Sequence, residues 1–297
     1  MKASVQTFKA GVEELLTFLT SSEHETELTG ILIQRQDSLD NAEKQLLSKI
    51  AASRTDRKRY VYAVTIVSLY GLLERFVDTL IEAFIARIAG AVSSYDKMPT
   101  KIQDNHIPMS LALVKAIGEE RHRTGMTQKE VIANLHSCLT GDENFRVNGS
   151  AFVLHRGNIS LTRITEFLSS VGIDTHFRRV TLTPDLLNLF REREERDISK
   201  VGDPELKALL QPIDDLVERR NQVSHGVINI DDIESIDLLK ERCRFVAAYG
   251  GAVYTVLVQE ALKYQIDRAN VQRLGKPIKV FNNSIFPGLF LKSGANI

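Results

Sequence analysis

Two long segments with apolar residues at helical spacing constrain the fold of this chain more than any other feature. The first covers about residues 56–92 and the second about residues 233–268. Side chains three and four positions apart share one face of a helix, so each segment can turn a continuous apolar face inward. Small residues from Ala247 to Ala252 allow another helix to approach the second segment closely. The sequence therefore predicts an all-α protein built around two long helices.

Shorter helices are predicted around these two. We expect helices at 3–20 and 37–52, separated by a polar loop at 21–30, as an N-terminal helical extension covering residues 1–55. The core then runs from 56 to 268, with an inserted helical lobe at about 107–200. A further helix at 212–225 precedes the second long helix, and residues 269–297 form a C-terminal tail that is either a terminal hairpin or a poorly ordered extension.

Local signals place several boundaries in the inserted lobe. Turn-forming residues predict a loop at 93–108, with helices at 109–122 and 127–139 after it. Thr127 and Glu130 form the sequence pattern of a capping box. Asn148-Gly149 is typical of a two-residue hairpin turn and allows a short β-hairpin in the otherwise helical fold. Helices are also expected at 160–172 and from Thr183-Pro184 onward. Asp231 or Asp232 is the expected N-cap of the last long helix.

Composition limits the classes of partner. Among 297 residues, Lys and Arg together number 38, as do Asp and Glu, so a nucleic-acid partner must meet a local basic patch. The two cysteines have no metal-ligand spacing and are expected to be buried in a reducing cytosol. The most apolar run, Val61–Leu73, is too short to span a membrane, and the N-terminus lacks a signal peptide pattern. We expect a cytoplasmic protein.

The stretch Gln211–Gly226 carries the most informative polar residues. Pro212 suits the first turn of a helix and Gly226 its end. On this helix His225 lies one turn after Asn221, about 40° around the axis, and Arg220 lies roughly 100° to the other side. An imidazole and a carboxamide on one face, beside a guanidinium, can hold a phosphodiester and move a proton.

The spacing Arg220–Asn221–x3–His225 resembles the signature of HEPN domains, the helical ribonucleases of prokaryotic defence and toxin systems. Two further segments resemble a subgroup of stand-alone HEPN proteins. VSLYGLLERFVDTLIEAF, ending at Phe84, looks like the first core helix of that subgroup, and NISLTRITEFLSSVGID, starting at Asn158, looks like its middle region.

The resemblance implies a metal-independent endoribonuclease with no cofactor, formed by a two-fold dimer that faces two such helices across one cleft. The implied roles are His225 as base or acid, Arg220 on the scissile phosphate, and Asn221 orienting His225 or the ribose. The expected partners are therefore RNA, a second copy of the chain, and an antitoxin or defence-system protein. The sequence shows no zinc-ligand spacing and no nucleotide-binding glycine loop.

Other residues have more than one interpretation. Arg219 either assists RNA binding or points to solvent. Arg57 and Arg59 belong to a basic cluster that is either a solvated helix start or a phosphate-contact patch. Tyr70 and Glu74 lie one turn apart, and Glu74 is either a buried partner of an arginine or an exposed residue at the helix edge.

Two alternatives remain for the motif itself. Arg220, Asn221 and His225 can form a helix C-cap network that includes an Asn–His hydrogen bond. The protein can also be a non-catalytic dimeric interaction or sensor subunit of a defence or toxin–antitoxin complex. Some such HEPN domains are silenced by modification of a tyrosine two residues after the histidine. Here that position is Val227, so this modification is not expected.

Overall fold

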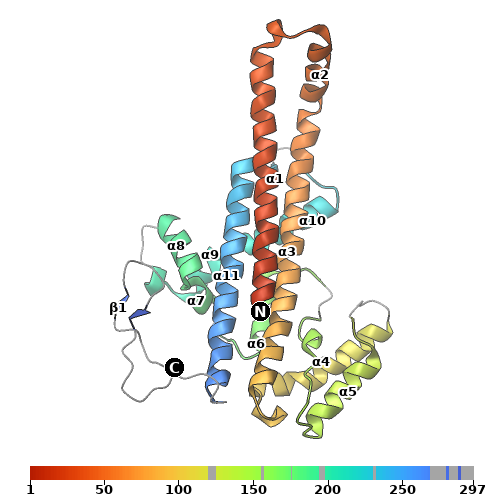
Figure 1. Cartoon of the computed structure of the whole chain (residues 1–297), viewed down its shortest axis with the longest axis vertical. Helices are drawn as coiled ribbons and strands as arrows, with labels where there is room; N and C mark the ends of the chain where they lie inside the picture. The colour runs from red at the N-terminus through yellow and green to blue at the C-terminus, as the bar shows by residue number, and fades with distance from the viewer. Residues whose placement is uncertain are drawn as a thin grey trace.

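Three long helices form the frame of the protein in a computed structural model. They are α1 (Lys2–Gln34), α3 (Arg54–Ala91) and α11 (Ile236–Asp267), and each packs against the other two. Figure 1 shows α1 running antiparallel to α3 and α11. The all-α class is confirmed. The structure describes residues 1–119, 125–154, 157–174, 176–193, 198–229, 232–267, 279–280 and 287–288.

The periodicity of α3 explains why it is the central helix. Leu69, Leu73, Leu80 and Phe84 are fully buried and recur at intervals of four and seven residues. They form an apolar stripe on one face of α3. Packing such a stripe against other helices is the main source of stability for an amphipathic helix in a protein. The expected helix at about 56–92 is therefore confirmed, with a start two residues earlier.

α1 and α11 approach each other closely where α11 has a glycine. The ring of Phe8 stacks on that of Phe76, with 4.3 Å between centroids. A Cβ atom at Gly250 would overlap a ring carbon of Phe8 and lie 3.1 Å from a ring carbon of Phe76. The close approach that the small residues of α11 predicted therefore occurs, and it depends on the missing side chain at Gly250.

The expected loop at 21–30 is wrong, because α1 continues through it to Gln34. Hydroxyl groups in this stretch bond back to the helix, for example Thr26 Oγ1 to the Ser22 carbonyl at 2.9 Å. Glu23 forms an ion pair with Lys240 of α11 at 2.5 Å, and Glu25 forms one with Arg57 of α3. The polar composition therefore reflects an exposed helix with charged neighbours rather than a break in the helix.

The end of α1, the turn η1 (Gln36–Ser38), α2 (Asn41–Ala52) and the start of α3 form a helical hairpin. Figure 1 shows it extending beyond the N-terminal end of α11. Asp40 caps α2, since its carboxylate accepts the Glu43 N–H at 2.8 Å and Glu43 accepts the Asp40 N–H at 2.8 Å. The second helix thus begins four residues later than expected.

The lobe after α3 contains the turn η2 (Tyr95–Lys97), α4 (Thr100–Gly118) and α5 (Gln128–Leu139). The capping box of Thr127 and Glu130 is confirmed at the start of α5. The expected loop at 93–108 is wrong in its second half, because α4 begins at Thr100 and contains Pro108. A proline inside a helix removes one backbone hydrogen bond. Here the fully buried His106 and Ser110 on either side hold the helix in place.

The expected hairpin at Asn148-Gly149 is also wrong. The chain forms a short 3-10 turn, η3 (Gly149–Ala151), and Asn148 has a φ of −74°, whereas the predicted turn type needs positive φ. The Asn148 amide is buried and donates to Ser110 Oγ and to the Val131 carbonyl, both at 3.0 Å. A Cβ at Gly149 would lie 3.3 Å from the Cα of Glu82. Asn148 therefore supplies buried hydrogen bonds, and Gly149 lets this turn approach α3 closely; the two residues do not form a turn between strands.

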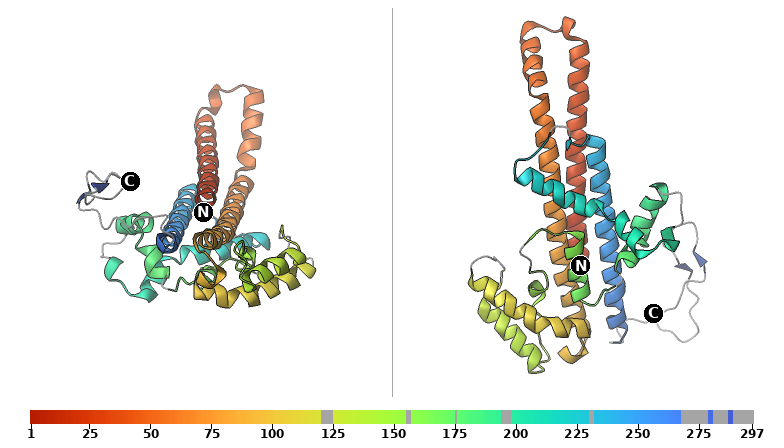
Figure 2. Two further views of the ribbon diagram at one scale, coloured as in Figure 1. Left: turned by 60° about the horizontal axis from the view of Figure 1, so that its bottom comes forward. Right: turned by 180° about the vertical axis from the view of Figure 1, so that it is seen from behind.

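The remaining elements are α6 (Leu161–Ser170), α7 (His176–Thr181), α8 (Pro184–Arg193), η4 (Ile198–Lys200), α9 (Asp203–Leu209), α10 (Pro212–Ser224), β1 (Lys279–Val280) and β2 (Pro287–Gly288). Of these, α6, α7, α8 and α10 pack against α3 or α11. β1 and β2 pair antiparallel. Figure 2 shows α10 lying across the long helices rather than along them.

The N-cap expected for the last helix is wrong for Asp232, and Asp231 lies outside the described residues. α11 begins at Ile236, and Ser235 Oγ accepts the Leu238 N–H at 3.3 Å. Among the described residues, Ile236–Tyr264 is also long and apolar enough to cross a membrane, but 56% of its most apolar window is buried in the protein, as in a core helix.

We predict that Gly250→Ala lowers the free energy of unfolding by about 1–3 kcal/mol, because the added methyl group overpacks the Phe8 contact. Urea unfolding followed by circular dichroism measures this change. Gly71→Ala in α3 is the matched control. It meets no atom within 4 Å and should stabilise the helix by about 0.5–1 kcal/mol. Equal stability changes in the two variants would contradict the close approach of α1 and α11.

Candidate active site

The helix α10 carries the motif and begins and ends where its sequence dictates. Pro212 occupies its first turn. At the other end Gly226 has a φ of +71°, a conformation that glycine adopts without strain. Its N–H donates to the Val223 carbonyl at 3.1 Å, and the Val227 N–H donates to the Gln222 carbonyl at 2.9 Å. The backbone thus satisfies the helix end, and His225 follows as the C-cap residue.

Arg219 fixes α10 to α3 and α11. Its Nε donates to Asp215 Oδ2 at 2.8 Å, its Nη1 donates to the Tyr62 hydroxyl at 3.0 Å, and its Nη2 lies 3.4 Å from Glu234 Oε1. Arg242 of α11 contacts both Asp215, at 2.6 Å, and Glu234. The Arg242 and Glu234 side chains are only 10% and 12% exposed. Arg219 is thus engaged in a largely buried ion-pair network, neither pointing freely to solvent nor open to a ligand.

The carboxylate of Asp215 stays ionised within this network. Burial alone would raise its pKa, but the hydrogen bond from Arg219 and the charge of Arg242 outweigh burial and lower the pKa. Charge-assisted hydrogen bonds of this kind are stronger than neutral ones. The network therefore holds α10 in one position across the bundle.

Arg220 faces a different set of partners. Its guanidinium carbon lies 4.8 Å from the ring centroid of Tyr70, a cation–π geometry. Its Nη1 donates to Asn158 Oδ1 at 3.0 Å and to Asn221 Oδ1 at 3.3 Å. Asn158 Nδ2 also donates to Asn221 Oδ1 at 2.7 Å. A guanidinium and two carboxamides thus form a closed hydrogen-bonded set on a tyrosine ring.

Tyr70 supports this set from α3. Its hydroxyl accepts the buried Ile159 N–H at 2.9 Å and donates to Glu74 Oε1 at 3.1 Å. Burial raises the pKa of Tyr70, so the hydroxyl keeps its proton. Glu74 is half-buried and accepts from Tyr70, and it forms no ion pair with an arginine within the described part of the chain. It therefore supports Arg220 through Tyr70.

His225 lies apart from this set. It is exposed at the end of α10, and its ring forms no hydrogen bond with any described residue. Asn221 Oδ1 instead accepts from Asn158 and Arg220. The Asn–His hydrogen bond of the C-cap alternative is therefore not formed, and the imidazole is open to a ligand.

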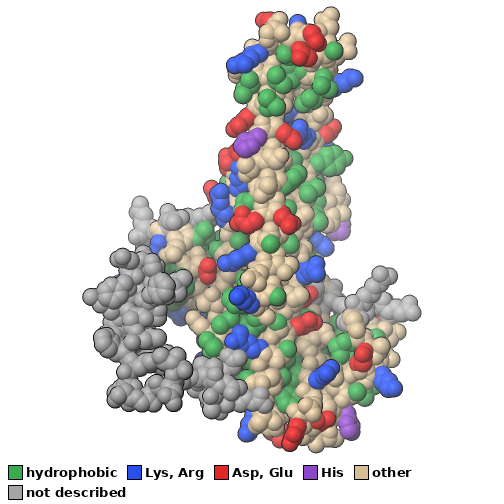
Figure 3. Space-filling view, viewed as in Figure 1, with side chains coloured by type: hydrophobic (Ala, Val, Ile, Leu, Met, Phe, Trp, Pro, Cys, Tyr) green, Lys and Arg blue, Asp and Glu red, His purple; other side chains and the backbone are tan. Residues whose placement is uncertain are grey.

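Arg57 and Arg59 lie at the start of α3, outside this set. Arg57 pairs with Glu25. Arg59 is half-buried, and its Nε has no hydrogen-bond partner among the described residues. Neither contacts Arg220, Asn221 or His225. On the face shown in Figure 3, acidic and basic side chains are interspersed along the long helices. RNA binding on this face would therefore depend on local groups.

Sequence reasoning missed Asn158, Tyr62 and Arg242 as parts of the site. Asn158 is the first residue of the segment that resembles the middle region of HEPN proteins, so the resemblance pointed to its neighbourhood but not to its role. Tyr62 lies 157 positions from its partner Arg219, and no local pattern connects them. Among the described residues, no group of three or more His, Cys, Asp or Glu side chains is placed to hold a metal ion.

A helical bundle that presents an Arg–Asn–x3–His helix end is the architecture of a HEPN domain. The model of the RiboL-PSP-HEPN family matches residues 31–259, most of the chain. The protein therefore belongs to the RiboL-PSP-HEPN family, and HEPN domains are commonly associated with ribonuclease activity. No curated protein and no solved structure matches the chain.

We predict that Tyr70→Phe lowers the free energy of unfolding by about 1–3 kcal/mol, because it leaves the buried Ile159 N–H without its acceptor. The aromatic ring under Arg220 is kept. Tyr254→Phe on α11 is the matched control, since its hydroxyl forms no hydrogen bond with any described residue and its loss should change stability little. Both are measured by urea unfolding. An unchanged stability of Tyr70→Phe would show that Tyr70 does not hold the segment before α6.

Proposed function

We propose that the protein is a cytoplasmic, metal-independent endoribonuclease that acts in defence or as a toxin. One observation carries the proposal. The guanidinium of Arg220 is held without a carboxylate partner in the described residues, five positions before the open imidazole of His225 on the same helix. A fixed positive charge and an exposed proton carrier are two groups that cleavage of a phosphodiester needs.

Arg220 has the donors for a phosphate. Its hydrogen bonds within the described residues use Nη1, which leaves the N–H groups of Nη2 and Nε. The ring of Tyr70 and the two carboxamides restrict its position before a substrate arrives. Such preorganised charge stabilises the charge that develops on phosphate oxygens in the transition state.

His225 supplies proton transfer, since histidine is the side chain that most often acts as a general acid or base. With no metal-activated water in the proposed reaction, the nucleophile is the 2′-hydroxyl of the RNA itself. When His225 removes its proton, the 2′-oxygen bonds to the adjacent phosphorus, and the bond to the 5′-oxygen breaks as that oxygen takes a proton. The products are a 2′,3′-cyclic phosphate and a 5′-hydroxyl.

Base and acid steps require two proton carriers, and each chain provides one motif histidine. We therefore propose a homodimer that faces two α10 helices across the substrate. Tyr60, Val64 and Val67 recur at i, i+4 and i+7 on α3 and are 70%, 48% and 42% exposed. They form an apolar stripe on the helix that also supplies Tyr62 and Tyr70. This stripe is the proposed dimer contact.

We predict that His225→Ala lowers RNA cleavage by about 10²–10⁴-fold, the usual loss for an acid–base group. Stability should change little, because the side chain is exposed. His136→Ala, which removes an exposed histidine of α5, is the matched control and should leave cleavage unchanged. Wild-type expression should slow growth of the host, and His225→Ala should relieve this effect.

The ends of the cleaved RNA test the mechanism in the same assay. Cleavage should survive excess chelator, leave a 2′,3′-cyclic phosphate, and fail on DNA or on RNA with a 2′-deoxy residue at the cut. Products with 5′-phosphates, or activity that chelator removes and magnesium restores, would refute the mechanism. A stable dimer without cleavage or growth inhibition would instead support the non-catalytic interaction or sensor subunit.

We predict that Val64→Asp weakens the dimer, because a carboxylate in an apolar contact loses its hydration. Light scattering at micromolar concentration should show dimers for the wild type and more monomer for the variant, with a matching loss of cleavage. Ile132→Asp on α5, where the side chain is 55% exposed, is the control and should remain dimeric. A monomeric wild type with full activity would contradict the proposed pairing of two α10 helices.

A further inference from the structure

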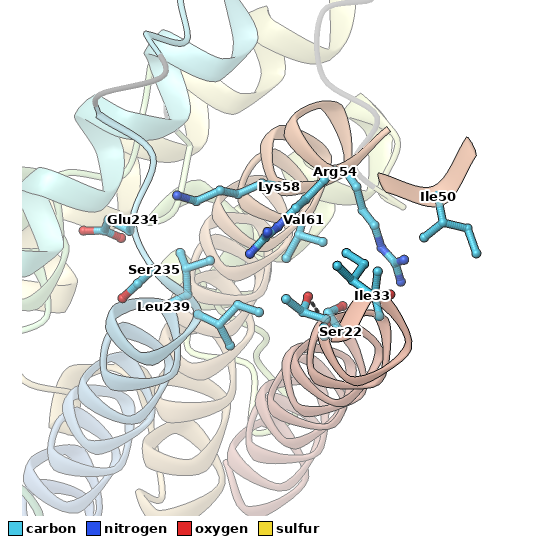
Figure 4. Close-up of a pocket in the computed structure, with 14 residues that line it drawn as sticks. Ser22, Ile33, Ile50, Arg54, Lys58, Val61, Glu234, Ser235 and Leu239 are labelled. Atoms are coloured by element: carbon cyan, nitrogen blue, oxygen red, sulfur yellow. Dashed lines mark hydrogen bonds between the residues drawn. The ribbon is translucent and has the colours of Figure 1, made fainter. Parts of the chain in front are cut away.

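A second concave site lies away from α10, where the projecting hairpin meets the start of α11. Its volume is about 310 Å³, within the range of small-molecule sites. Ile33, Val61 and Leu239 are among its apolar walls, and Arg54, Arg57 and Lys58 supply positive charge from α3. Figure 4 shows Arg54 and Lys58 extending in different directions around this pocket. None of Arg220, Asn221 and His225 lines it.

The charges of the pocket do not balance. Arg57 is paired with Glu25, and the acidic lining residue Glu234 is engaged by both Arg219 and Arg242. Arg54 and Lys58 are exposed and form no ion pair with any described residue. The pocket therefore has two uncompensated cations next to an apolar surface.

This combination selects the class of ligand. An apolar wall favours a hydrocarbon or aromatic body, while free cations favour an anionic group. A metal ion would be repelled by the cations. An RNA backbone would leave the apolar walls without a contact. RNA bases usually stack on aromatic side chains, and no aromatic ring is among the lining residues.

We propose that this pocket binds a small organic anion with an apolar body, whose carboxylate, sulfonate or phosphate is attracted by the positive charges of Arg54 and Lys58. The body of the ligand packs on Ile33, Val61 and Leu239. The site is separate from the proposed ribonuclease centre. Its acidic wall, Glu234, belongs to the ion-pair network that holds α10, so one side chain connects the pocket to that network.

Gly30 offers a way to fill the pocket without disturbing the fold. It lines the pocket from α1, and a Cβ there would meet no atom within 4 Å. Leucine favours the helix more than glycine does, so Gly30→Leu should fold at least as well as the wild type. Gly90→Leu, at an equally open position near the end of α3, is the matched control.

The test uses 8-anilinonaphthalene-1-sulfonate, an aromatic monoanion that fluoresces in apolar sites, and its uncharged analogue N-phenyl-1-naphthylamine. We expect saturable binding of both probes to the full chain. Replacing Arg54 and Lys58 together by Gln should lower the affinity for the anionic probe roughly tenfold, as for the loss of charge-assisted contacts. The same change should leave the affinity for the neutral probe within about twofold of the wild-type value. Gly30→Leu should lower the affinity for both probes, and Gly90→Leu should change neither affinity.

The measurement needs no RNA, so it is independent of the ribonuclease, and His225→Ala should bind both probes normally. Circular dichroism confirms that the variants are folded. Anion binding that is unaffected by the Gln replacements would overturn the assignment of the charged group. If Gly30→Leu bound both probes like the wild type, the pocket would not be their site. Equal loss of both probes on replacing the two cations would show an apolar groove without anion selectivity.

Discussion

The ion-pair network around Arg219 holds α10 in place and thereby positions Arg220. A buried ion pair gains little over apolar packing, but removing one partner leaves an uncompensated charge and is strongly destabilising. Asp215, Arg219, Glu234 and Arg242 share their charges, so α10 has one favourable position on α3 and α11. Successive residues of a helix point about 100° apart. Fixing Arg219 inward thus directs Arg220 to the ring of Tyr70.

The site gathers groups from three distant parts of the chain. Tyr70 comes from α3, Asn158 from the segment before α6, and Arg220 with Asn221 from α10. Each also has a role in folding, because Tyr70 accepts a buried backbone N–H and Asn158 ties its segment to α10. His225 alone forms no such contact within the described residues, so its replacement is expected to leave stability unchanged.

Periodicity predicted the long helices well, since their apolar stripes are long and their burial is one-sided. It failed where tertiary contacts overrode local signals. Residues 21–30 are polar because they face charged neighbours. Asn148 is a typical turn residue, but here its side-chain amide is buried and donates a hydrogen bond to Ser110. In the candidate site, the sequence alone places Arg220, Asn221 and His225 near one helix end because they lie on one helix. It does not place Asn158 and Tyr62 there, because their partners lie 62 and 157 positions away.

The segment before α6 is attached to the site at two backbone amides. The Ile159 N–H donates to the Tyr70 hydroxyl, and the Leu161 N–H donates to Asp214 Oδ1 of α10 at 2.7 Å. Both protons can exchange with solvent deuterium only when this segment separates from α3 and α10. Their exchange rates therefore measure how often the contacts of Arg220 with Tyr70 and Asn158 open in the resting protein, with neither substrate nor mutation present.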